Sequence, residues 1–160
     1  MTTPVTAENV GRAVTALQSG GVIAMPTDTL YALASDARDA EAVARVYAIK
    51  GREDGKPLPL FVADVAMAER YAAVSEMARR LAERFWPGAL TLVLRKRDDF
   101  ESAALAGGET VALRAPDHPI ARAVIEALDG PVTATSANRS GGPNPVRIRC
   151  KKGEGPRWQY

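Results

Sequence analysis

The chain has few of the residues that form metal centres or disulfide scaffolds. Its 160 residues include one cysteine, Cys150, and one histidine, His118. A single cysteine cannot form an internal disulfide, and a zinc or haem site built from Cys and His side chains needs more of them. We therefore expect no resident metal site, so any metal would be bound through oxygen atoms.

Long apolar runs are also missing. No stretch approaches the ~20 consecutive apolar residues of a membrane-spanning helix, and the first thirty residues lack a basic segment followed by an apolar run. The composition, 46% hydrophobic and 25% charged, is typical of globular proteins. The sequence thus predicts one cytoplasmic domain that has no membrane association.

The excess of positive charge is confined to the C-terminal end of the sequence. The net charge is +2, but residues 146–160 hold five basic residues and one acidic residue, which leaves −2 for the rest. A general basic coat for nucleic acid is therefore absent, and an anion site must be built by a few placed residues. Apolar periodicity ends near residue 140, so we expect a domain over 1–145 and a disordered or non-native basic tail over 146–160.

Helix and strand patterns alternate along the sequence. Apolar residues at helical spacing predict helices over about the first twenty residues, after Asp39, Asp64 and Ser75, and over 118–128, where Asp117 would cap the helix. Short apolar runs predict strands at 22–25, 31–34, 58–62, 90–94, 111–113 and 131–135. This order predicts an α/β or mixed α+β fold. Phe85 and Trp86, at the end of one helix, are expected in the core.

Three cations follow one predicted helix: Lys50, Arg52 and Lys56. Arginine can bind two phosphate oxygens and lysine supplies a mobile charge, so the group suits a phosphorylated ligand. Cations at a helix C-terminus also offset the helix dipole, which leaves a purely structural role open. A P-loop is excluded because three residues, not four, separate the glycines and because Pro57 follows the lysine.

Two more strand exits carry polar side chains. Residues 26–29 place Thr27, Asp28 and Thr29 in one turn, and residues 133–138 end in Ser136 and Asn138. Turn formation alone could explain each of them. However, open α/β sheets bind ligands at strand ends, so the three segments together favour a phosphorylated ligand. His118 is expected to be structural, because no partner for nucleophilic catalysis can be argued around it.

Five ordered blocks make the sequence recognisable. They are GGVIAMPTDTLYAL at 20–33, KGREDGKPL at 50–58, WPGALT at 86–91, RAPDHP at 114–119 and SANRSG at 136–141. Together they resemble the YrdC/TsaC family of threonylcarbamoyl-AMP synthases, over about residues 8–145. The resemblance implies a single twisted α/β domain with a large mixed sheet, helices beside it and a concave cationic cleft.

The resemblance also implies a reaction. Family members make L-threonylcarbamoyladenylate and pyrophosphate from L-threonine, bicarbonate or CO2, and ATP, the first step toward N6-threonylcarbamoyladenosine at position 37 of tRNA. Mg²⁺ is the expected companion of ATP, and tRNA and a downstream threonylcarbamoyl transferase are possible partners. Because the attacking carbamate carboxylate is already anionic, a site without a histidine base suits this chemistry.

By similarity, each matching residue receives a role. The residues implied at the ATP site are Lys50, Arg52, Lys56, Thr110, Ser136, Asn138 and Asn144, with Lys50 and Arg52 acting in catalysis. The residues implied at the threonine site are Thr29, Arg114 and, as part of the cleft wall, Tyr31.

The sequence departs from the family at two places. Ala32 stands where the family usually has glycine, and family members continue for tens of residues beyond the last block, so we expect a domain cut short at its C-terminal end. Two other functions stay open: a carbamoyl-adenylate enzyme of the hydrogenase-maturation type, which is normally much longer, and a non-catalytic RNA-binding module that uses the cleft and the basic tail.

Overall fold

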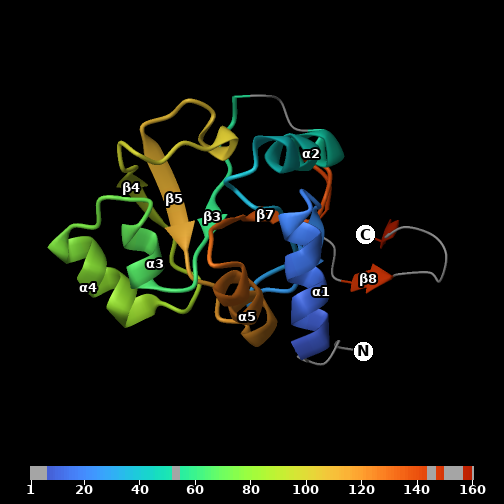
Figure 1. Cartoon of the computed structure of the whole chain (residues 1–160), viewed down its shortest axis with the longest axis horizontal. Coiled ribbons are helices and arrows are strands. Elements are labelled where there is room, and N and C mark those ends of the chain that lie inside the picture. The colour runs from blue at the N-terminus through green and yellow to red at the C-terminus, as the bar shows by residue number, and fades with distance from the viewer. Residues whose placement is uncertain (1–6, 52–54, 144–146, 150–156, 160) are drawn as a thin grey trace.

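Helices flank two β-sheets in the computed structural model, which describes residues 7–51, 55–143, 147–149 and 157–159 (Figure 1). The helices are α1 (Ala7–Gln18), α2 (Ala40–Lys50), α3 (Val65–Glu69), α4 (Glu76–Phe85) and α5 (Pro119–Leu128), with a 3-10 turn at Ala103–Leu105. None of the helices described is long and apolar enough to cross a membrane. The predicted mixed α/β class is confirmed.

The strands divide into two main sheets, where the sequence predicted one large sheet. The first has the order β1 (Ile23–Met25), β2 (Ala32–Ala34) and β7 (Thr135–Ser136), with antiparallel pairs. The second has the order β4 (Leu92–Arg95), β5 (Thr110–Arg114), β3 (Leu60–Phe61) and β6 (Val132–Thr133). Its β3 and β5 are parallel, and its other pairs are antiparallel.

One predicted strand, 131–135, proves to be two. β6 pairs in the four-stranded sheet, and after Ala134 the chain enters β7 of the three-stranded sheet. The buried Thr133 joins the sheets: its N–H donates to the carbonyl of Ser35 at 2.9 Å, and its Oγ1 accepts from the N–H of Ser35 at 3.0 Å. The sequence of residues 131–135 gave no sign that the chain changes sheets here.

Most helix starts follow the predicted caps. Asp39 Oδ1 accepts from the N–H groups of Glu41 and Ala42 at 2.9 and 3.1 Å. The predicted cap of α5 was wrong, because the cap is His118 rather than Asp117: its Nδ1 accepts from the N–H of Ile120 at 3.3 Å. Proline suits the first helical position, so α5 begins at Pro119, one residue later than predicted.

The core lies between the sheets and the helices, and α1 packs against α5. Its largest fully buried side chains include Leu33, Leu60, Leu113 and Ile125. Phe85 was wrongly placed in this core, since its side chain is 52% exposed. The reason is that α4 buries the small side chains Ala78 and Ala82 against the domain.

The end of the chain contains a pair of short strands. β8 (Arg147–Arg149) and β9 (Arg157–Gln159) are antiparallel, although the sequence predicted no regular structure there. The division of the chain at residue 145 stays a prediction. Cys150 lies outside the described residues.

Candidate functional site

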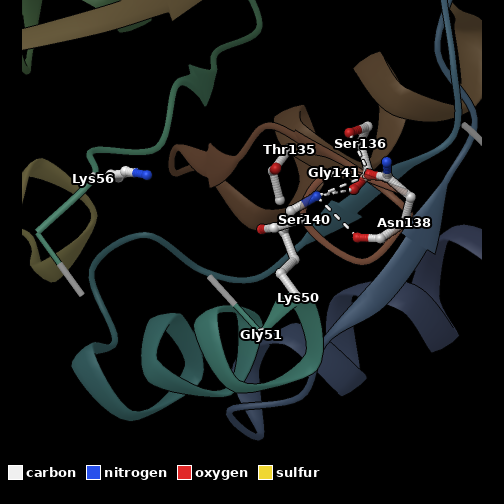
Figure 2. A pocket seen from close by; sticks show the side chains of 8 residues that line it. All are labelled: Lys50, Gly51, Lys56, Thr135, Ser136, Asn138, Ser140 and Gly141. Atoms are coloured by element: carbon white, nitrogen blue, oxygen red, sulfur yellow. Dashed lines mark hydrogen bonds between the residues drawn. The ribbon is translucent and has the colours of Figure 1, made fainter. Parts of the chain in front are cut away.

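A recess of about 350 Å³ opens where α2 ends beside β7 (Figure 2). Its walls are polar side chains and backbone. They come from Lys50, Gly51, Lys56, Thr135, Ser136, Asn138, Ser140 and Gly141. Four residues that the sequence assigned to the ATP site therefore lie together: Lys50, Lys56, Ser136 and Asn138.

Lys50 lines the recess and is only 3% exposed. Its Nζ donates to the carbonyl oxygens of Ser136 and Asn138 at 2.6 and 3.0 Å, and to Asn138 Oδ1 at 3.0 Å. Its own carbonyl accepts from the N–H of Ser140 at 2.8 Å. A buried ammonium is tolerated when its protons are all bound, so Lys50 ties the end of α2 to the loop that follows β7.

This loop is held by its own side chains as well. Ser136 Oγ donates to Asn138 Oδ1 at 2.6 Å, and Asn138 Nδ2 donates to the carbonyl of Gly142 at 2.6 Å. The amide of Asn138 is therefore bound at both ends. The backbone around the recess is fixed before any ligand arrives, which favours tight binding.

Lys56 differs from Lys50 in being exposed. Figure 2 shows it on the other side of the recess, across from Lys50. Its backbone is anchored because Tyr47 Oη donates to the carbonyl of Lys56 at 2.8 Å. Gly51 starts the intervening loop in the left-handed conformation, with φ of 56°, which glycine adopts without strain. Arg52 and Asn144, two other residues of the predicted ATP site, lie outside the described residues.

A second polar group surrounds Arg114 at the end of β5. Its Nη2 donates to Asp28 Oδ1 at 2.6 Å, its Nη1 to Thr29 Oγ1 at 3.2 Å and its Nε to the carbonyl of Gly88 at 2.9 Å. Its guanidinium carbon lies 5.8 Å from the centre of the Phe61 ring. Thr29 and Arg114, which the sequence assigned to threonine, are thus in contact. The sequence identified the 26–29 turn but gave Asp28 no role.

The turn that carries Thr29 is built by its own hydroxyl groups. Thr27 Oγ1 donates to the carbonyl of Leu30 at 2.5 Å and accepts from the N–H groups of Thr29 and Leu30 at 3.2 and 3.1 Å. Serine and threonine commonly close short turns in this way. The turn presents Thr29 at the surface, beside Arg114.

Tyr31 connects the two polar groups. Its carbonyl accepts from the N–H of Ala137 at 2.8 Å, and the next residue, Ala32, is paired with Ser136. Ala32, where the family usually has glycine, lies in β2 and is buried without a left-handed backbone. The recess at Lys50 and the Arg114 group are therefore linked through one backbone connection.

Thr110 lies apart from the recess. Alternation along β5 puts Thr110 and Arg114 on the same face of the sheet, separated by about 13 Å at the usual rise of a strand. Thr110 is exposed, and it does not line the recess. The structure thus brings four predicted residues together at the recess and Thr29 with Arg114 in a second group, and it leaves Thr110 at the far end of β5.

Comparisons with known proteins place the chain among its relatives. A family model named Sua5_yciO_yrdC, described as "Telomere recombination", matches residues 15–152. The chain belongs to this family. The threonylcarbamoyl-AMP synthase of Bacillus subtilis is 42% identical over 140 residues, which are 86% of this chain and 40% of that protein. The chain thus spans about two fifths of the length of this relative.

Solved structures of the family agree with the fold. The crystal structure of Pyrococcus abyssi Sua5 complexed with L-threonine matches with a TM-score of 0.85 and 39% identity, over 90% of this chain and 43% of that one. Full-length HypF in the phosphate- and nucleotide-bound form matches with a TM-score of 0.75 and 28% identity, over 84% of this chain and 21% of that one. The predicted family and fold are confirmed.

Proposed function

We propose that this chain forms L-threonylcarbamoyladenylate and pyrophosphate from L-threonine, bicarbonate or CO2, and ATP. The observation that carries the proposal is the 39% identity with a Sua5 protein whose structure contains L-threonine. The relatives named threonylcarbamoyl-AMP synthase support it, although this chain spans only part of their length. The two polar groups supply complementary halves of such a site.

The recess beside Lys50 suits the nucleotide. Lys56 and Arg52 would bind the phosphate oxygens, because charged donors form the strongest hydrogen bonds to phosphate. Ser136, Asn138 and Asn144 would hold the rest of the nucleotide. Lys50 would contribute positive charge at the wall of the recess. Its three protons bind oxygen atoms of Ser136 and Asn138, so it would also keep this loop in place.

The Arg114 group suits the amino acid. Arg114 would bind the threonine carboxylate, while Thr29 and the wall at Tyr31 would contact the rest of the molecule. Thr110 does not line the recess, so its role at the ATP site stays an expectation from the family resemblance.

The chemistry needs positioning and positive charge rather than a base. A carbamate oxygen forms a bond to the α-phosphorus, the bond from that phosphorus to its bridging oxygen breaks, and pyrophosphate leaves with the electron pair. The attacking carboxylate carries its negative charge already, so no proton has to be removed in this step. Cations at the recess would stabilise the charge that develops on the phosphates.

Mg²⁺ would enter with the nucleotide. No group of three or more His, Cys, Asp or Glu side chains that could hold a metal occurs within the part of the chain that the structure describes. The oxygen ligands that Mg²⁺ requires would then come mainly from the triphosphate and water, as is common for this ion. It would partly neutralise the phosphate charge.

The product is a reactive mixed anhydride, so an enzyme must consume it soon after it forms. A downstream threonylcarbamoyl transferase that modifies tRNA fits this role. Both reactions would take place in the cytoplasm. Direct binding of this chain to tRNA is part of the same proposal.

The proposal is tested by following pyrophosphate and the adenylate together. We expect release of both only when ATP, bicarbonate and L-threonine are all present, because only the carbamate provides the attacking carboxylate. Equal release with serine, or without an amino acid, would contradict it.

A further inference from the structure

The ion pair between Asp28 and Arg114 is unusually shielded from water. The two side chains are 18% and 12% exposed. In every other ion pair found within the described residues, at least one side chain is 36% exposed or more. Shielding strengthens charge interactions, so a charged ligand at this pair would be bound more strongly than at the open surface.

The pair still has unused hydrogen-bonding groups. Arginine carries five N–H groups. Among the residues that the structure describes, Arg114 uses three of them, on Gly88, Thr29 and Asp28, which leaves one on each terminal nitrogen. Asp28 accepts through Oδ1. Its Oδ2 has no hydrogen-bond partner within the described part of the chain, and Asp28 as a whole residue is exposed, although its side chain is only 18% exposed.

These groups match the charges of one kind of small molecule. An α-amino acid is a zwitterion whose carboxylate and ammonium groups lie on the same carbon. The two free N–H groups of Arg114 suit the two oxygens of a carboxylate, and the free oxygen of Asp28 suits an ammonium. Because the pair is neutral overall, it does not attract a polyanion, whereas Lys50 and Lys56 at the recess do.

The geometry points to Asp28 as a residue that determines specificity: its carboxylate accepts a hydrogen bond from the α-ammonium group of an amino acid whose carboxylate is bound by Arg114. That this amino acid is threonine rests on the proposed function. The contact survives carbamoylation, since a carbamate nitrogen keeps one N–H. Asp28 thereby selects amino acids over simple hydroxy acids and over phosphates.

The test compares three ligands on the full chain by calorimetry. L-Threonine has both charged groups, 3-hydroxybutyrate lacks the ammonium, and threoninol lacks the carboxylate. We expect Asp28→Asn to weaken binding of threonine and of threoninol at least tenfold. Binding of 3-hydroxybutyrate should be unchanged or tighter, because a like charge is removed.

A matched control removes the same charge from an exposed ion pair. Asp99 is paired with Arg97 at 3.1 Å and is 74% exposed, so Asp99→Asn should leave binding of all three ligands unchanged. A comparison on the wild-type chain needs no variant: threonine should bind at least tenfold more tightly than 3-hydroxybutyrate. Equal affinity for the two would overturn the inference even if Asp28→Asn did not fold.

Other outcomes separate the two proposals. An equal loss of threonine and 3-hydroxybutyrate binding in Asp28→Asn would mean that Asp28 acts only by positioning Arg114, and this overturns the inference. Threonine-dependent release of pyrophosphate with an unchanged threonine affinity in the variant overturns it as well, but leaves the proposed function intact. Asp28-dependent threonine binding without any pyrophosphate release supports the inference and overturns the proposed function.

Discussion

Lys50 Nζ lies 2.6 Å from the carbonyl oxygen of Ser136, although 86 positions separate the two residues in the sequence. The contact joins the C-terminal end of α2 to the exit of β7, and it belongs to a set of three hydrogen bonds from one ammonium group. The loop that borders the recess therefore depends on a side chain from a different element.

We expect Lys50→Met to destabilise the fold. The change would remove three hydrogen bonds. The Ser136 carbonyl would keep the N–H of Asn138 as a donor and Asn138 Oδ1 would keep Ser136 Oγ, whereas the Asn138 carbonyl would lose its donor from Lys50. An unsatisfied buried acceptor costs about 1–3 kcal/mol, so the free energy of unfolding should fall by about 1–3 kcal/mol. Urea denaturation measures this change. Lys56→Met is the matched control: the side chain is exposed, so stability should change by less than about 0.5 kcal/mol. Equal stability of the two variants would argue against the role of Lys50 in the loop.

Nucleotide binding should depend on the cations that are expected to contact the phosphates of ATP. Arg52→Ala and Lys56→Ala should each weaken ATP binding by about 1.5–3 kcal/mol, because each removes a charged hydrogen bond to phosphate. The fold should stay intact in both variants. Calorimetry gives the affinity and a melting curve gives the stability. An unchanged affinity with a lowered melting temperature would return these residues to a structural role.

Much of the site could be predicted from the sequence because its residues stand in short blocks. Helix spacing and the cap at Asp39 place Lys50 at the end of α2, and a strand before Ser136 places that residue at a sheet edge. The sequence could not reveal that Lys50 is bound by the Ser136 loop. Local patterns do not encode contacts between distant elements, and a lysine after a helix is usually solvated.

The fold was predicted less completely where local signals compete. Asp117 and His118 can both cap a helix, and only the position of Pro119 decides between them. The apolar stripe of α4 has helical spacing, yet the buried side is formed by alanines, because close packing can select small side chains over large ones. Asp28 was overlooked because a carboxylate in a turn is normally explained by the turn itself.

The absence of a side chain at Gly130 leaves room for the guanidinium group of Arg38. A Cβ added at Gly130 would clash with this group, whose Nη2 donates a hydrogen bond to Asp36 Oδ2 at 2.7 Å. The guanidinium group is the end of a flexible side chain that is 42% exposed, so it can move aside in Gly130→Ala at the cost of its hydrogen bonds to Asp36. We expect the stability to fall by about 0.5–1.5 kcal/mol. Gly11→Ala is the control: it lies in α1 with nothing within 4 Å of the new atom, so the variant should be as stable or more stable. Thermal melting distinguishes the two.

Asp129 links stability to pH at the end of α5. The hydrogen bond from Arg70, together with its positive charge, lowers the pKa of Asp129 from its ordinary value. The folded state thus binds the proton less well than the unfolded state. The stability that the ion pair contributes is therefore present above the pKa of Asp129 in the unfolded chain, and it is lost as the pH falls through the lower pKa of the folded state. In Arg70→Gln the melting temperature should therefore fall less than in the wild-type chain as the pH is lowered. An equal fall in the two chains would exclude this linkage.

Thr133 should be essential for joining the two sheets. Thr133→Val keeps the shape of the side chain but removes Oγ1, the acceptor for the N–H of Ser35 at 3.0 Å, and both residues are fully buried. A buried N–H left without a partner costs about 1–3 kcal/mol, which should appear in urea denaturation. Thr133→Ser, which keeps the hydroxyl and loses a methyl group, should cost less than Thr133→Val. The reverse order would show that packing, and not the hydrogen bond between the sheets, is what this position provides.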